Sequence, residues 1–358
     1  MIYNNDNVYF EIKLPPKMNE TAADRIIIIH NESGSFLMLV GQKTIYSRKI
    51  DEEYDSRYSR VELKVLEGNE EISACHLLNS PISNVPCMLL TTTQGRLINC
   101  QVFVDEESLK LDEVVLEPPK RYLSSLTSYF VGGDDSETNF HYIASDTRNK
   151  TKAHLYVFGE RSINIWTLST DGADLWKINV QNAFMKNVNN LGEIKRFKII
   201  AQEVIEGAFE IDKILNVVIQ IYCQRDRASK DFIVLYYLFR INVNPETKKY
   251  IDYMPGQLCE PKPYRVQEDD LNCLVCTNEG EVTYVFMCYE TYTLCYNVFS
   301  NQIEENQIDV RIIGHGINVE KVRTFMLFAD RDILIFSLLR EMTFKNLMKF
   351  YLKEVEEN

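Results

Sequence analysis

The stretch HLYVFGERSINIWTLSTDGADLWKINV (154–180) contains three apolar or alternating segments separated by two short connections. The segments are HLYVFG (154–159), SINIWTLS (162–169) and DLWKINV (174–180). Their length, and their content of β-branched and aromatic residues, are typical of strands. The connections, Glu160-Arg161 and Thr170-Asp171-Gly172, are short enough to join neighbouring strands. This stretch therefore predicts three consecutive strands of one sheet.

The same rhythm of strand, turn and strand continues on both sides of this stretch. Six groups of strands are clear in the sequence, and they span 25–50, 86–117, 154–180, 195–254, 271–299 and 322–339. Groups of three or four short strands that recur every ~40–50 residues are typical of propeller blades.

We predict from this rhythm an all-β fold, a seven-bladed β-propeller with small helical insertions that covers residues 1–340. The N-terminal segment VYFEIKL (8–14) would close a seventh blade by pairing with the last strands. A stacked pair of β-sandwiches would give a similar density of strands. The propeller is favoured because no linker divides the chain into two sandwiches.

Two segments interrupt the strand pattern and predict helices. QNAFMKNVNNL (181–191) predicts one short helix inserted between blades. In the tail MTFKNLMKFYLKEVEEN (342–358), the apolar residues recur with helical spacing opposite a charged face. We expect 341–358 to begin a C-terminal helical segment, an amphipathic helix, of a longer protein.

The charge of the chain limits the classes of partner that it can bind. Its 358 residues carry 39 Lys and Arg against 52 Asp and Glu, a formal net charge of −13. An acidic chain without a basic block is a poor candidate for binding nucleic acid directly. No apolar run reaches the ~18 residues of a membrane span. With no signal peptide at the N-terminus, we expect the protein in the cytosol or the nucleus.

The sequence contains no set of residues that indicates catalysis or a cofactor. The nine cysteines are an odd number spread through strand-like segments, which predicts free thiols in a reducing compartment. Cys273-x-x-Cys276 lacks the second ligand pair that structural zinc needs, so we interpret these cysteines as core thiols. Phosphate loops, dinucleotide fingerprints and nucleophile elbows are absent. We therefore expect no enzyme, no cofactor and no small-molecule substrate.

One segment between two predicted blades, PPKRYLSSLTSYFVGGDDSETN (118–139), indicates a membrane contact. On a helical wheel its large apolar residues share one face, and Ser and Thr occupy the other. An uncharged polar face opposite bulky apolar residues is the composition of segments that sense lipid-packing defects. A loop tucked against the propeller, or another strand, is the alternative interpretation. The candidate contact residues are Tyr122, Leu123, Leu126, Tyr129, Phe130 and Val131.

The order of features from His154 onward resembles one known family. A strand leads to Trp166, an acidic-glycine turn follows, a second strand holds Trp176, and a short helix spans 179–189. This order is similar to that in the propellers of the scaffold nucleoporins of one hundred and thirty-three kilodaltons, from the Y-shaped complex of the nuclear pore. In that family a membrane-sensing loop lies just upstream, where RYLSSLTSYF (121–130) lies here, although this loop is shorter and lacks the family's glycine-rich character.

The resemblance implies a structural module of the nuclear pore's outer ring, at the nuclear envelope, which supports transport of mRNA and protein. It implies other Y-complex nucleoporins as partners, bound through the helical region beyond the propeller, and a curved nuclear-envelope membrane at the loop. The large inner-ring scaffold nucleoporin, with its related propeller, is the nearest alternative within this class. The alternative outside it is a WD-like adaptor propeller of another intracellular complex, with no membrane role.

Overall fold

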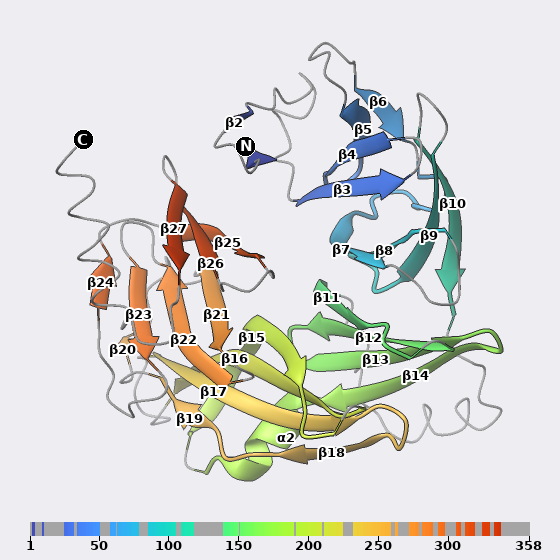
Figure 1. Cartoon of the computed structure of the whole chain (residues 1–358). Coiled ribbons are helices and arrows are strands. Elements are labelled where there is room, and N and C mark those ends of the chain that lie inside the picture. The colour runs from blue at the N-terminus through green and yellow to red at the C-terminus, as the bar shows by residue number, and fades with distance from the viewer. Residues whose placement is uncertain are drawn as a thin grey trace, which may run out of the picture. The chain divides into compact units, whose positions relative to one another are not determined.

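The computed structural model shows a chain of β-strands arranged in antiparallel sheets (Figure 1). By their contacts the residues fall into two compact units, Met1–Ile178 (unit 1) and Asn179–Asn358 (unit 2). The structure describes residues 2–3, 9–10, 25–31, 34–50, 58–61, 63–78, 85–104, 109–117, 139–149, 151–189, 191–209, 211–224, 232–258, 262–263, 272–278, 281–288, 293–297, 306–308, 312–318, 324–329 and 333–337.

Unit 1 contains three four-stranded sheets in which strands consecutive in the sequence pair with one another. The first consists of β3 (Arg25–Asn31), β4 (Gly34–Val40), β5 (Ile45–Ile50) and β6 (Ser59–Val61). The second consists of β7 (Ile72–Leu78), β8 (Cys87–Thr92), β9 (Leu97–Val104) and β10 (Leu109–Leu116). The third consists of β11 (Phe140–Asp146), β12 (Lys152–Gly159), β13 (Ser162–Ser169) and β14 (Gly172–Asn179).

Unit 2 continues with the helix α2 (Val180–Asn187) and three further antiparallel sheets. The first consists of β15 (Glu193–Glu206), β16 (Lys213–Gln224), β17 (Ile233–Asn244) and β18 (Lys249–Asp252), with β19 (Gly256–Gln257) and β20 (Lys262–Pro263) also paired to β17. The second consists of β21 (Asn272–Asn278), β22 (Glu281–Cys288), β23 (Thr293–Asn297) and β24 (Asn306–Ile308). The third consists of β25 (Ile312–Asn318), β26 (Thr324–Ala329) and β27 (Ile333–Ser337).

The six groups of strands predicted from the sequence correspond to these six sheets, so that prediction is confirmed for the residues that the structure describes. In the stretch 154–180 the predicted strands are β12, β13 and β14, and they pair in sequence order. Five strands at the beginning or the end of their sheets were not predicted from the sequence: β6, β7, β11, β24 and β25. The two-residue strands β1, β19 and β20 were not predicted either. β7 (ISACHLL), for example, mixes small, polar and apolar residues, so its pattern does not indicate a strand by itself.

The seventh blade remains a prediction. Within the segment 8–14, Tyr9–Phe10 forms β2, and β2 pairs with β1 (Ile2–Tyr3) in a two-stranded sheet. The extension of a single propeller over 1–340 also remains a prediction. The predicted tail helix, 342–358, lies outside the described residues.

The core of unit 1 lies between successive sheets, because the central strands bury both faces. All six residues of β8 are buried. Successive side chains of a strand point to opposite faces. Accordingly Met88 and Leu90 pack with the first sheet, in a cluster that includes Phe36, whereas Leu89 packs with the third sheet, in a cluster that includes Trp166. A continuous apolar strand thus joins three layers.

Contacts between first strands repeat within each unit. In unit 1 β7 contacts β11, and in unit 2 β15 contacts β21 and β21 contacts β25. Each of these strands is the first of its sheet. These three pairs of successive sheets therefore contact each other through equivalent strands, an arrangement compatible with neighbouring propeller blades.

Candidate functional site

The predicted membrane-contact residues fall in a part of the chain that the structure does not describe. Tyr122, Leu123, Leu126, Tyr129, Phe130 and Val131 all lie within 118–138. The flanking residues are described: β10 ends at Leu116 and β11 begins at Phe140. The segment therefore connects the second sheet of unit 1 to the third, as predicted, and its contact with membrane stays a prediction. Among the described residues no helix is long and apolar enough to cross a membrane.

The stretch that carries the family resemblance forms a regular hairpin. Trp166 lies in β13 and is buried, with only 5% of its surface exposed. The predicted acidic-glycine turn follows: the Asp171 amide donates to Ser169 Oγ over 3.3 Å, and Gly172 has φ of +130°. A φ of this sign favours glycine. β14 then carries Trp176 out of the turn.

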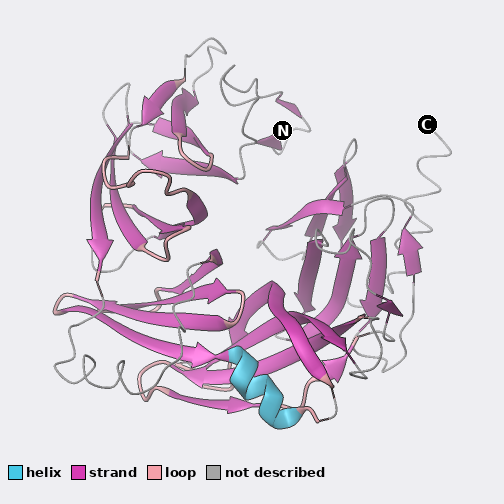
Figure 2. Ribbon diagram, turned by 180° about the vertical axis from the view of Figure 1, so that it is seen from behind, coloured by secondary structure: helices cyan, strands magenta, loops and turns pink. Residues whose placement is uncertain are grey.

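The short helix predicted after this hairpin is confirmed as α2, the one helix among the described residues (Figure 2). Asn179 caps its N-terminus, because its Oδ1 accepts a hydrogen bond of 2.8 Å from the Asn182 amide. Val180, Ala183 and Phe184 form its buried face.

Phe184 anchors α2 on the first sheet of unit 2. Its ring meets those of Phe197, Tyr237 and Phe239 edge to face, with centroids 5.8, 5.1 and 5.8 Å away. Edge-to-face contacts of this kind add stability beyond the burial of apolar area. The opposite face of this sheet packs on the next one, through a cluster that includes Val218 and Val285. The helix therefore covers the face that the following sheet leaves open.

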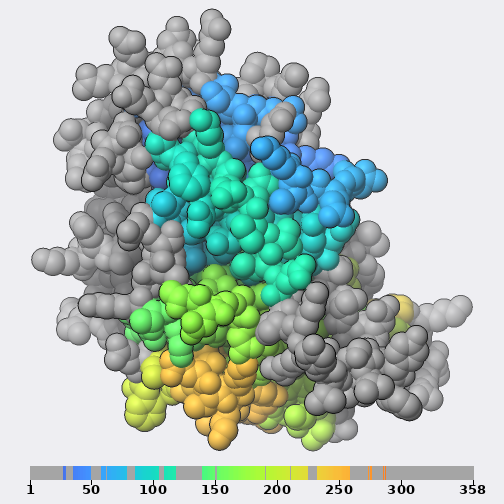
Figure 3. Space-filling model, turned by 90° about the vertical axis from the view of Figure 1, so that its right-hand side faces the viewer, coloured from blue at the N-terminus to red at the C-terminus, as the bar shows by residue number. Residues whose placement is uncertain are grey.

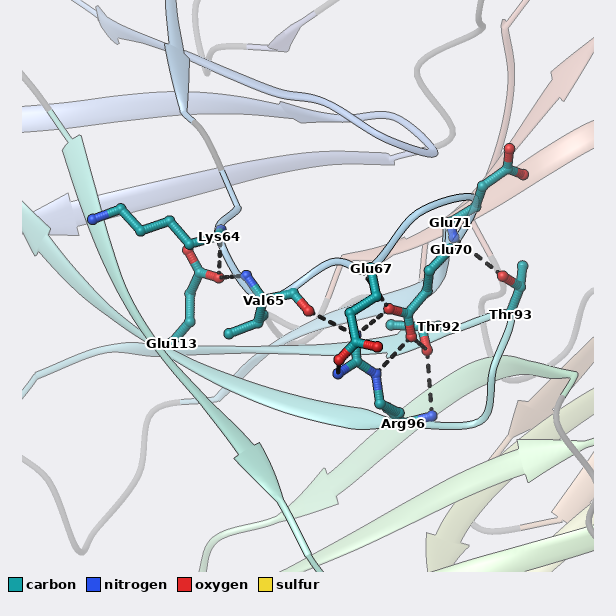
Figure 4. Close-up of polar contacts among 9 residues, drawn as sticks. All are labelled: Lys64, Val65, Glu67, Glu70, Glu71, Thr92, Thr93, Arg96 and Glu113. Atoms are coloured by element: carbon teal, nitrogen blue, oxygen red, sulfur yellow. Dashed lines mark hydrogen bonds and ion pairs between the residues drawn. The ribbon is translucent and has the colours of Figure 1, made fainter.

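A cluster of polar side chains in unit 1, centred on Glu70, was not found from the sequence (Figure 4). Glu70 is 2% exposed and lies just before β7. Arg96 Nε donates to Glu70 Oε1 over 2.8 Å, and the Arg96 Nη2 pairs with Glu70 Oε2. Thr92 Oγ1 also donates to this carboxylate, as does the Glu67 amide, over 3.1 Å.

A second group of contacts ties the connection between β6 and β7 to the second sheet. Arg96 Nη2 donates to the Val65 carbonyl over 2.7 Å, and Nη1 reaches the Glu67 carboxylate at 3.1 Å. Glu113 of β10 accepts from the Lys64 and Val65 amides, with its Oε2 2.9 and 3.0 Å away. Arg96 and Glu113 thus fix the backbone of this connection against the turn between β8 and β9 and against β10. We call these contacts the Glu70–Arg96 clamp.

The clamp is suited to holding structure and not to catalysis. The hydrogen bonds from Arg96 lower the pKa of Glu70 to about 2. Their effect outweighs that of burial, which raises the pKa. A carboxylate with so low a pKa stays ionised at neutral pH and is a weak base. Its oxygens already accept from Arg96, Thr92 and Glu67. No sequence signal could have found it, because Glu70 and Arg96 are far apart in the chain and turns rich in acidic residues are usually solvated.

Two histidines take part in contacts inside unit 1. His76 of β7 lies 2.8 Å from Ser145 Oγ of β11, so it links two successive sheets, and burial lowers the pKa of its imidazole. His154, 4% exposed, lies 3.1 Å from Thr167 Oγ1 on the neighbouring strand. Each ring is thus positioned beside a hydroxyl group, and the lowered pKa of His76 favours its neutral form.

The cysteines that the structure describes are thiols within or beside strands. Cys75, Cys87, Cys100, Cys223 and Cys273 are of this kind. Cys273 of the C-x-x-C pair lies buried in β21, as predicted. Burial raises the pKa of the Cys100 thiol to about 12, so it is not a nucleophile at neutral pH. Within the described ranges, no group of three or more His, Cys, Asp or Glu could hold a metal ion.

Comparison with known proteins indicates which type of fold this chain has. No protein-family profile matches the chain, and no curated protein matches its sequence. Among solved structures it is similar to the Nup133 β-propeller domain of Vanderwaltozyma polyspora, with a TM-score of 0.58 and 14% identity. The likeness covers 88% of this chain and 83% of that domain. At this identity the likeness is one of fold, and the fold is that of a β-propeller domain.

Proposed function

We propose that this chain is a scaffold propeller of the nuclear pore's outer ring, in the Y complex, and that it is not an enzyme. The proposal is carried by the structural likeness to a nucleoporin propeller over 88% of the chain. It also draws support from the order of elements after His154. The buried Trp166, the acidic-glycine turn, the Trp176 strand and then α2 occur in the order on which the family resemblance rests.

The chemistry of the described residues is compatible with a structural role. The Glu70–Arg96 clamp immobilises a connection between two sheets. The helix α2 uses its buried face to cover a sheet. A module of this kind supplies a rigid body to an assembly. The partners that we propose are other Y-complex nucleoporins, bound through the helical region that begins in the tail, with the loop 118–138 in contact with curved membrane.

The location of the protein in its own cells, and the proteins that it binds there, test this proposal. We expect the fluorescently tagged full chain to label the nuclear rim and to co-purify with Y-complex nucleoporins. Leu347→Asp, on the apolar face predicted for the tail, should abolish co-purification, because a carboxylate would enter the interface. Lys353→Asp, on the charged face, is the matched control and should leave co-purification intact.

Other results would replace this proposal. Labelling of the cytoplasm or nucleoplasm without the rim, with co-purification of a ubiquitin ligase or a DNA-damage factor, would establish the adaptor propeller. If the protein labelled the rim but both tail variants lost their partners, the proposed location would stand. The proposed role of the apolar face in binding would be wrong.

A further inference from the structure

The turn between β15 and β16, Gly207–Asp212, is held by its own backbone and by one side chain. The Gly207 amide donates to the Asp212 carbonyl over 2.9 Å, and the Asp212 amide donates to the Phe209 carbonyl over 3.0 Å. A Cβ on Gly207 would lie 2.7 Å from Asp212 Cβ and 2.8 Å from its backbone carbon and oxygen. Only glycine allows the two ends of this turn to approach so closely.

The turn is also tied to the next hairpin. Asn244, the last residue of β17, donates from Nδ2 to Asp212 Oδ1 over 2.8 Å. In the space-filling view the hairpin of β17 and β18 (orange) and the β15–β16 end (yellow-green) lie side by side at the surface (Figure 3). A bond between two hairpins limits the movement of the turn, so its side chains are presented in a defined arrangement.

The defined turn exposes two large apolar side chains. Phe209 is 73% exposed and Ile211 is 45% exposed. At 73% exposure Phe209 contributes little to the stability of the fold by burial. An aromatic side chain on a preorganised backbone is the type of residue that dominates protein interfaces. The turn therefore has the properties of an anchor for a partner.

The charge around the anchor is acidic. Residues 203–213 contain four carboxylates against one lysine, a formal charge of −3. The lysine, Lys213, has a side chain only 4% exposed and pairs with Glu206 Oε2 at 2.8 Å, whereas the Glu206 side chain is 61% exposed. The positive charge of Lys213 thus lies inside, whereas the Glu206 carboxylate lies toward solvent. A partner that covers Phe209 must approach through a negative field.

We propose that the Gly207–Asp212 turn docks a segment of another protein that is both apolar and basic. The apolar side chains of the segment would cover Phe209 and Ile211, and its Lys or Arg side chains would meet the carboxylates around them. This inference does not depend on the proposed place in the nuclear pore. It concerns a surface of unit 2 and rests on the exposure of Phe209 and Ile211 and on the acidic residues near them.

Three synthetic peptides of ~18 residues, about five helical turns, separate the two components of recognition. The first is an amphipathic peptide of Leu and Lys, the second has Glu in place of Lys, and the third contains Lys alone. We expect the intact chain to bind the Leu-Lys peptide at least about tenfold more tightly than either of the others, measured by fluorescence anisotropy. Added salt should weaken this binding.

The variants locate the site. Phe209→Ser should weaken binding of the Leu-Lys peptide by about tenfold or more, with an unchanged melting temperature because the side chain is exposed. Val114→Ser removes a comparably exposed apolar side chain from β10, 54% exposed in unit 1, and should leave binding unchanged. If Phe209→Ser and the unaltered chain bound the peptide equally, the proposal would be overturned. The overall charge of −13 would then explain the binding without the turn. If the Leu-Glu peptide bound as tightly as the Leu-Lys peptide, the proposal that the partner segment is basic would be wrong.

Discussion

The connection that precedes β7 and the turn that joins β15 to β16 each contain a carboxylate bound by other segments. In the first, Glu70 is 2% exposed and accepts from Arg96, Thr92 and Glu67. In the second, Asp212 accepts from Asn244, and the turn exposes Phe209. The Glu70 carboxylate is buried and the Phe209 side chain is exposed, which reverses the usual distribution of charged and apolar groups in a protein.

The difference between the two turns shows how to separate residues that hold the fold from those available to a partner. An ion pair inside the protein is costly to break, since the remaining charge cannot be solvated. An exposed phenylalanine contributes little to folding, so its side chain is available to a partner. We therefore expect substitutions in the clamp to change stability, and side-chain substitutions at the tip of the turn to change binding.

The largest effect is expected from Arg96→Met. This substitution leaves the Glu70 carboxylate buried without its cation, and the free energy of unfolding should fall by about 3–5 kcal/mol. Urea denaturation of the whole chain measures it. The matched control is the double substitution Glu70→Gln with Arg96→Met, which should regain part of the loss because no buried charge remains. A fall below about 1 kcal/mol for Arg96→Met would show that the clamp is solvated and would remove the contrast between the two turns.

A smaller effect is expected from acid. The pKa of Glu70 lies at about 2 in the folded chain, below its ordinary value of 4.5. Its contribution to stability is therefore complete above pH 4.5 and is lost as the pH falls through about 2, on the order of 3 kcal/mol in total. Other carboxylates titrate in this range, so the measured quantity is the difference in unfolding free energy between the unaltered chain and Glu70→Gln. A difference that stays constant between pH 5 and pH 2 would contradict the clamp.

The smallest effect is expected from Gly207→Ala. The new Cβ would overlap Asp212, whose backbone atoms cannot move freely, and the free energy of unfolding should fall by about 1–3 kcal/mol. Gly256→Ala is the matched control in the same sheet, because nothing lies within 4 Å of its Cβ position. Its effect should remain within about 0.5 kcal/mol. If the two variants were equally stable, the turn would not be held as tightly as its hydrogen bonds indicate.

Much of the strand content could be predicted from the sequence alone. Segments such as 162–169 and 213–223 carry enough β-branched and aromatic residues to specify a strand locally, and glycines such as Gly172 mark the turn between two of them. The helix α2 was likewise visible, and its bounds moved by one to four residues. These features are local, because each depends on residues that are neighbours in the chain.

The tertiary structure decided which strands complete a sheet and which polar residues lie inside. β7 and β11 belong to their sheets because adjacent strands supply hydrogen bonds and apolar neighbours, which a seven-residue segment of mixed composition does not reveal by itself. Glu70 and Arg96 meet because the turn between β8 and β9 lies against the connection before β7. The exposure of Phe209 is also a tertiary property, because the sequence makes phenylalanine apolar but only the packing of the surrounding strands determines whether anything covers it.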